Sequence, residues 1–113
     1  MKKKQRKASI DIQISLNENN VPEHIYWKAS DNKNNQANAQ AFLLSFWDSE
    51  TKNSFNIDLW TKEMTMEEMK FFIFQSLLKM SNIIERSTGD ENLVHTMKEF
   101  SKKFGKMADI LKS

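Results

Sequence analysis

Apolar and polar residues alternate in two stretches near the start of the chain. The alternation runs over residues 10–16 and again over residues 25–29, and a period of two residues is typical of a half-buried strand. Between them, Asn17 to Pro22 has turn chemistry, since Asn tolerates left-handed backbone and Pro22 stops a strand ladder. We therefore expect a hairpin of two strands joined by this turn.

Two further strands are predicted after a polar, Asn-rich segment at residues 31–38, which we interpret as an exposed loop. Residues 41–47, AFLLSFW, are apolar on both faces. Such a run is typical of a central strand covered on each side, or of a helix fragment. Its length and the polar turn after it favour the strand. Residues 55–59 alternate again and pair back through that turn.

Two helices follow the strands. Thr65 and Glu68 have the spacing of a capping box, which marks a helix start. Gly89 suits the left-handed position that ends a helix, and Asp90 suits the N-cap of the next one. Gly105 lies inside the second predicted helix, where the close approach of a neighbour or fraying of the last turns would account for it.

The first predicted helix is apolar around most of its circumference. One stripe suits a sheet-facing side and contains Met66, Met69, Ile73, Leu77, Met80 and Ile84. Phe71, Phe74 and Leu78 lie on a flank beyond that stripe. A helix with this much apolar surface needs a second partner, which is either the C-terminal helix or another molecule.

Four strands followed by two helices predict an α+β domain in two layers. We expect one four-stranded antiparallel sheet with the two-helix hairpin packed on one face, and a meander is the default strand order. Residues 1–7 form a basic flexible leader, and residues 8–113 form a single domain.

Composition and charge exclude some classes of site and argue against others. The chain has no cysteine, which excludes disulfides and thiolate metal sites. Five of its 17 Lys and Arg residues lie in the leader. The rest of the chain therefore has 12 basic residues and 15 Asp and Glu residues, which makes it mildly acidic. This argues against a nucleic-acid surface on the domain. The leader is a solvated tail, or it contacts an anionic membrane or nucleic acid. No apolar run suits a membrane span or a signal peptide, so we expect a cytoplasmic protein.

Catalytic groups are sparse. Asp48 follows the third strand and Asp58 interrupts the fourth, and two carboxylates near each other across the hairpin would suit an acid/base pair, but charged residues on an exposed sheet face are the favoured explanation. His24 and His95 are expected at the surface. The two glycines, Gly89 and Gly105, form no phosphate-binding loop. We predict no enzyme activity, no cofactor and no metal.

The aromatic residues are the candidate interaction surface. Trp60 is out of phase with the alternation at residues 55–59, so we expect it on the other sheet face, where it would share an apolar patch with a set from Phe42, Leu44 and Phe46. Exposed apolar patches mark partner contacts or an oligomer seam. The candidate interaction residues are Trp60, Phe71, Phe74, Leu78 and Phe46.

Several segments together resemble the gliding motility-associated GldC family. They are NVPE at 20–23, LSFWD at 44–48, IDLWTK at 57–62, QSL at 75–77 and ER at 85–86, with Thr88-Gly89 after them. The resemblance implies a small soluble accessory protein of the gliding machinery that acts beside membrane-bound components, and it transfers no catalytic residues.

The favoured hypothesis is a non-enzymatic accessory or adaptor protein. Its partners would be other gliding machinery proteins or a second copy of the chain, with a peripheral position at the inner membrane as one variant. The alternative is an anionic-surface or nucleic-acid binder that uses the leader and the face of Lys98, Lys102 and Lys106.

Overall fold

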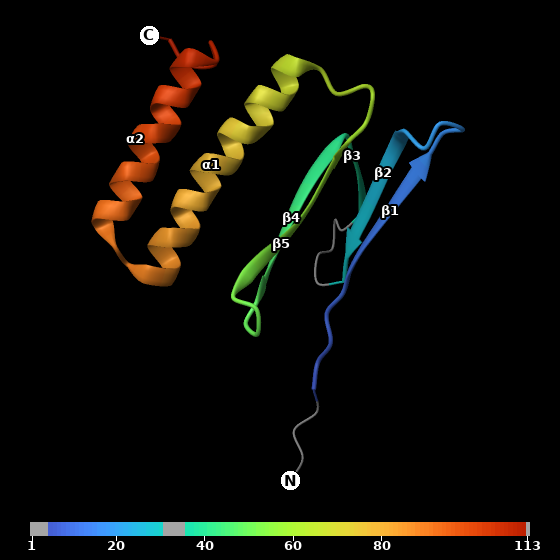
Figure 1. Cartoon of the computed structure of the whole chain (residues 1–113), viewed down its shortest axis with the longest axis horizontal. Coiled ribbons are helices and arrows are strands. Elements are labelled where there is room, and N and C mark those ends of the chain that lie inside the picture. The colour runs from blue at the N-terminus through green and yellow to red at the C-terminus, as the bar shows by residue number, and fades with distance from the viewer. Residues whose placement is uncertain (1–4, 31–35, 113) are drawn as a thin grey trace. The chain divides into compact units, whose positions relative to one another are not determined.

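The computed structural model describes residues 5–30 and 36–112, which form five strands and two helices (Figure 1). The elements are β1 (Ile10–Leu16), β2 (Pro22–Ala29), β3 (Gln36–Ala39), β4 (Ala41–Asp48), β5 (Asn53–Trp60), α1 (Met66–Thr88) and α2 (Glu91–Met107). The α+β class is confirmed.

The strands and the helices form two compact units, Met1–Met64 and Thr65–Ser113, and each is described by itself. Packing of the helices on a sheet face therefore stays a prediction, as does the single domain over residues 8–113. Most of the predicted basic leader, residues 1–4, lies outside the described residues. Neither helix in the described part of the chain is long and apolar enough to cross a membrane.

The first sheet contains β1, β2 and β3 in that order, all antiparallel. Ile12 pairs with Trp27 and Ile14 pairs with Ile25, so their side chains share one face. Ala37 and Ala39 of β3 extend the same face by pairing with Trp27 and Ile25. Ile25, on the middle strand, is buried. The alternation over residues 10–16 and 25–29 therefore marks the apolar face of this sheet, as predicted.

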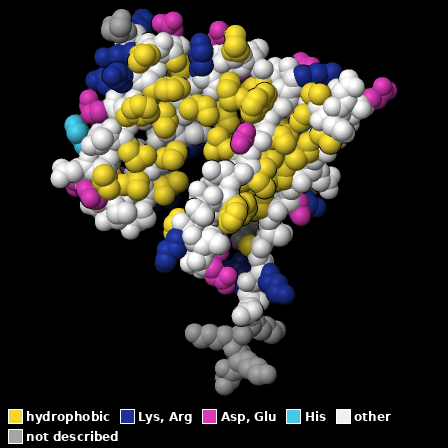
Figure 2. Space-filling view, in the orientation of Figure 1, with side chains coloured by type: hydrophobic (Ala, Val, Ile, Leu, Met, Phe, Trp, Pro, Cys, Tyr) yellow, Lys and Arg dark blue, Asp and Glu magenta, His cyan; other side chains and the backbone are white. Residues whose placement is uncertain are grey.

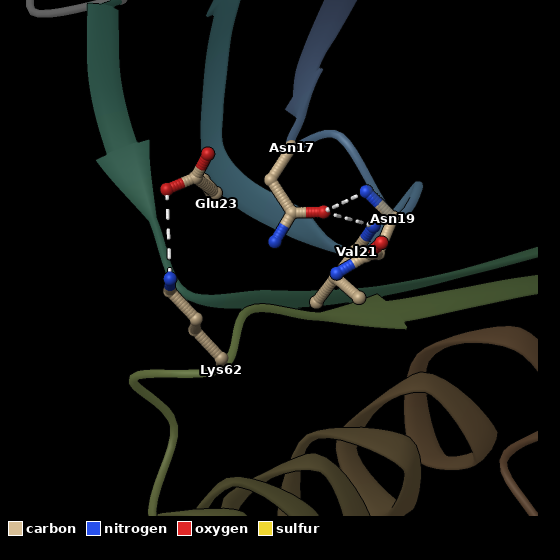
Figure 3. Close-up of polar contacts among 5 residues, drawn as sticks. All are labelled: Asn17, Asn19, Val21, Glu23 and Lys62. Carbon is tan, nitrogen blue, oxygen red and sulfur yellow. Dashed lines mark hydrogen bonds and ion pairs between the residues drawn. The ribbon is translucent and has the colours of Figure 1, made fainter.

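The β1–β2 turn is organised by one side chain. The Asn17 side-chain oxygen accepts hydrogen bonds from the N–H groups of Asn19 at 2.8 Å and Val21 at 3.0 Å (Figure 3). Asn20 adopts a left-handed φ of 61°, which Asn tolerates because its side chain is short and polar. Pro22 does not stop the ladder as expected. It begins β2 opposite Leu16, where the missing N–H is tolerated at a strand start.

The prediction of one four-stranded sheet is wrong, because β4 and β5 form a second, two-stranded sheet. Part of the predicted loop at residues 31–38 is strand β3, and residues 31–35 lie outside the described residues. Only Gln40 separates β3 from β4. The chain passes from one sheet to the other at this bend, and the Gln40 carbonyl accepts a 2.8 Å hydrogen bond from the Thr61 N–H.

Apolar side chains from both sheets line a cavity of about 210 Å³. They are Ile10, Ile12, Ile25, Trp27, Ala39, Ala41, Phe42 and Leu44. Lys62, just after β5, forms a 3.6 Å ion pair with Glu23 of β2 (Figure 3). The start of β4 and the end of β5, which lie together at the open end of the hairpin, are thus both tied to the first sheet.

The helix ends follow the sequence signals. The Thr65 side chain accepts a hydrogen bond from the Glu68 N–H, and the Glu68 carboxylate accepts one from the Thr65 N–H, so the predicted capping box is confirmed. Gly89 has a φ of 68° at the end of α1. The Asp90 carboxylate accepts from the Asn92 and Leu93 N–H groups at the start of α2.

The helices approach closely through small residues. Val94, Ser101 and Gly105 are the buried residues of α2, and Phe74 and Ser81 are those of α1. A Cβ atom at Gly105 would lie 2.7 Å from a ring carbon of Phe74 and 2.8 Å from a methyl carbon of Leu111. The close approach expected for Gly105 is therefore confirmed, and its absent side chain makes room for the Phe74 ring.

We predict that Gly105→Ala lowers the free energy of unfolding. Overpacking costs about 1–3 kcal/mol, which exceeds the gain of up to about 1 kcal/mol in helix propensity, so a net loss of about 1 kcal/mol is expected in urea denaturation. In a background that carries both Phe74→Leu and Leu111→Ala, where both close neighbours of position 105 are shortened, the same change should be neutral or stabilising. An equal loss in both backgrounds would contradict the packing explanation.

A second prediction concerns Thr61, which is 1% exposed and whose hydroxyl has no hydrogen-bond partner among the described residues. Thr61→Val replaces this buried polar group with an apolar one of the same shape, and should stabilise the protein by about 1 kcal/mol in urea denaturation. The matched change Thr65→Val removes an N-cap and should cost about 1 kcal/mol. Equal losses from both changes would mean that the Thr61 hydroxyl is satisfied.

Candidate functional site

The β4–β5 hairpin carries apolar side chains on both of its faces. Its register pairs Phe46 with Phe55, Leu44 with Ile57 and Phe42 with Leu59, so one face is apolar up to the Asp48–Asn53 pair at the turn. The opposite face mixes apolar and polar side chains, which are Ala41, Leu43, Ser45, Trp47, Ser54, Asn56, Asp58 and Trp60. We call these the apolar face and the mixed face of the hairpin.

Large aromatic side chains on both faces are solvent-exposed. The exposed fraction is 68% for Trp47 and 53% for Trp60 on the mixed face, and 56% for Phe46 on the apolar face. Figure 2 shows hydrophobic side chains at the surface of the molecule. Because Trp60 lies opposite Ala41, the two tryptophans stand about 20 Å apart along the hairpin at ~3.4 Å per residue. Leu43 lies between them on the same face.

Phe46 and Trp60 do not share a patch. The expectation that Trp60 lies with Phe42, Leu44 and Phe46 is wrong, because the register places those three residues on the apolar face and Trp60 on the mixed face. The residue that shares a face with Trp60 is Trp47, which the sequence interpretation missed. The sequence shows that Trp47 lies on the opposite face of its strand from Phe46. Only the register of the hairpin shows that this is also the face of Trp60.

Of the candidates on α1, Phe74 is buried and Phe71 and Leu78 are exposed. The Phe71 and Phe74 rings meet edge to face, with centroids 6.5 Å apart and an interplanar angle of 70°. Phe74 therefore supports the helix pair, since it packs beside Gly105. Phe71 leaves about half of its surface in solvent.

The candidate catalytic groups are not brought together. Asp58 pairs with Leu43, whereas Asp48 pairs with Asn53 at the turn, so the two carboxylates are separated by about 17 Å along the hairpin at ~3.4 Å per residue. They also project from opposite faces. His24 lies on the polar face of the first sheet, opposite Ser15, and His95 is exposed on α2. Among the described residues, no group of acidic or histidine side chains could hold a metal ion.

Asp48 instead organises the hairpin turn. The Thr51 hydroxyl donates a 2.6 Å hydrogen bond to the Asp48 carboxylate, and the Glu50 N–H donates a longer one of 3.3 Å. These bonds favour the charged form and hold the pKa of Asp48 below its ordinary value. Lys52 completes the turn with a left-handed φ of 58°.

We predict that Thr51→Val raises the pKa of Asp48 toward its ordinary value, measured by NMR titration of the side-chain carboxyl carbon. Because the folded pKa lies below the unfolded one, the carboxylate stabilises the turn above the unfolded pKa, and this stabilisation is lost as the pH falls through the folded pKa. Thr96→Val, the same change on α2, should leave the pKa of Asp48 where it was. An unchanged pKa in Thr51→Val would assign the effect to the backbone donors.

Comparison with known proteins gives one match. Residues 22–110 match the family described as gliding motility-associated protein GldC-like, and they include every described strand and helix except β1. No curated protein and no solved structure matches the chain. Since the match covers most of the sequence, the chain belongs to the gliding motility-associated protein GldC-like family.

Proposed function

We propose that this protein is a non-enzymatic accessory protein of the gliding machinery, and that it acts through protein–protein contacts made by the β4–β5 hairpin. The family match supports the process. The exposed aromatic side chains on both hairpin faces support the mode of action, and this single observation carries the proposal. Exposed apolar patches mark binding surfaces on soluble proteins, and Trp is enriched among residues that dominate binding energy.

The mixed face is the better binding surface of the two. Trp47, Leu43 and Trp60 supply apolar contact area, and Asn56 and Asp58 between them supply polar groups. The Ser45 hydroxyl donates a 2.6 Å hydrogen bond to the Asn56 side chain, which fixes the centre of the face. Rigid aromatic anchors beside oriented polar groups are typical of protein interfaces.

The proposal predicts that Trp47→Ser and Trp60→Ser reduce gliding without unfolding the protein. Loss of a central Trp contact costs about 2 kcal/mol of binding, roughly a 30-fold loss of affinity. The free energy of unfolding should change by less than about 0.5 kcal/mol, because exposed residues contribute little to the fold. Colony spreading and single-cell speed are measured in a gliding bacterium that carries the variants in place of its own chain, beside the level of folded protein.

Lys28→Ala is the matched control, since Lys28 is exposed on the polar face of the first sheet, and it should leave gliding unchanged. A photo-crosslinking amino acid at position 47 should give crosslinks to motility proteins that the same residue at position 28 does not. Normal gliding with both tryptophans replaced contradicts the proposal. Loss of folded protein in these variants would instead assign the tryptophans to the core.

A further inference from the structure

Helix α2 carries a second apolar seam that its contact with α1 does not use. Leu93, Phe100 and Met107 repeat every seven residues, and Met97 and Phe104 repeat between them. This alternating spacing of four and three residues is that of a helix that packs against another helix along its length. The side of α2 that is buried contains Val94, Ser101 and Gly105 instead.

The outer members of this seam are exposed. Phe100 is 55% exposed and Met107 is 78% exposed, and Leu93 leaves about half of its surface in solvent. Small residues on the buried side let α2 lie close to α1, which leaves the larger side chains outside. The helical unit thus presents a row of apolar side chains that is suited to a third helix.

A groove marks where that third helix would bind. It has a volume of about 480 Å³ and is lined by Lys70 of α1, by Phe100, Lys103, Phe104 and Met107 of α2, and by Ala108, which caps α2. Its floor is apolar, and each of the two helices contributes one lysine. A second groove beside it is lined by Lys102, Lys103 and Lys106 together with Glu99.

The lysines at the groove favour an acidic binding partner over a second copy of this chain. Residues 98–112 contain five lysines against Glu99 and Asp109. A second copy that offered the same groove across a two-fold axis would bring the two lysines of one groove, Lys70 and Lys103, toward the same two lysines of the other, and like charges in contact oppose association. A helix with acidic residues beside its apolar stripe would instead pair with both lysines while its apolar side chains cover Phe100 and Met107.

We propose that this groove binds an amphipathic helix of a partner protein, with apolar residues at heptad spacing and acidic residues on both sides of them. The mode is the laying of one helix into the groove between two others. The proposal rests on α1 and α2 alone and is independent of the surface on the β4–β5 hairpin, so failure of either leaves the other standing.

The test uses the full chain and three synthetic peptides of about three heptads each. The first has Leu at the core positions and Glu beside them, the second has Lys in place of Glu, and the third has Ala in place of Leu. Fluorescence anisotropy should show the first peptide binding at least about tenfold more tightly than either of the others. Phe100→Ala should weaken its binding by about tenfold or more.

Reversing the charge of the two groove lysines gives a second test of the same proposal. The double change Lys70→Glu and Lys103→Glu should invert the preference, so that the Lys peptide binds more tightly than the Glu peptide. Lys79→Glu, the same change at an exposed α1 residue that does not line the groove, should preserve the preference. Far-UV circular dichroism of each variant checks that the helices remain.

Three results would overturn the proposal. One is the absence of binding by the Glu peptide, and another is equal binding of the Glu and Lys peptides. The third is a dimer of the full chain in analytical ultracentrifugation that Phe100→Ala converts to a monomer, since this would assign the seam to a second copy.

Discussion

The contact between Phe74 and Gly105 decides what the helical unit can present to other molecules. The side of α2 that contains Gly105 packs against α1, because the missing side chain leaves room for the Phe74 ring. The other side of α2 cannot contact α1 as well. The larger side chains at heptad spacing are then left outside. The local packing therefore favours an external surface over a larger internal core.

Local signals in the sequence predicted the local structure well. The Thr65 and Glu68 pair, the Gly89 helix end and the Asp90 cap are each set by hydrogen bonds or backbone angles within a few residues. The alternation of residues 10–16 has the same local character, because one sheet face is apolar and the other is polar. In such segments the neighbouring residues determine the local backbone conformation, and contacts with distant parts of the chain do not change it.

Non-local features could not be predicted in this way. Strand β3 has the sequence QANA, whose small and amide side chains have low strand propensity, and it is extended because β2 pairs with it. The division into two sheets depends on the bend at Gln40, for which no residue in the segment gives a signal. The faces of Phe46 and Trp60 follow from the β4–β5 register, and a register cannot be assigned from the alternation of one strand alone. The sequence therefore identified aromatic residues as candidates for the interface, but not which of them lie on the same face of the hairpin.

The single residue between β3 and β4 also has a mechanical consequence. Any pull on the β4–β5 hairpin reaches the first sheet through the Gln40 backbone, and the hydrogen bond from Thr61 and the Lys62–Glu23 ion pair provide a parallel path on the other strand. Both paths leave the hairpin at the same end, away from the Asp48 turn. Tension applied at that turn would therefore be shared by the two strands, and the load would fall on these attachments at the open end and not on the interstrand hydrogen bonds of the hairpin.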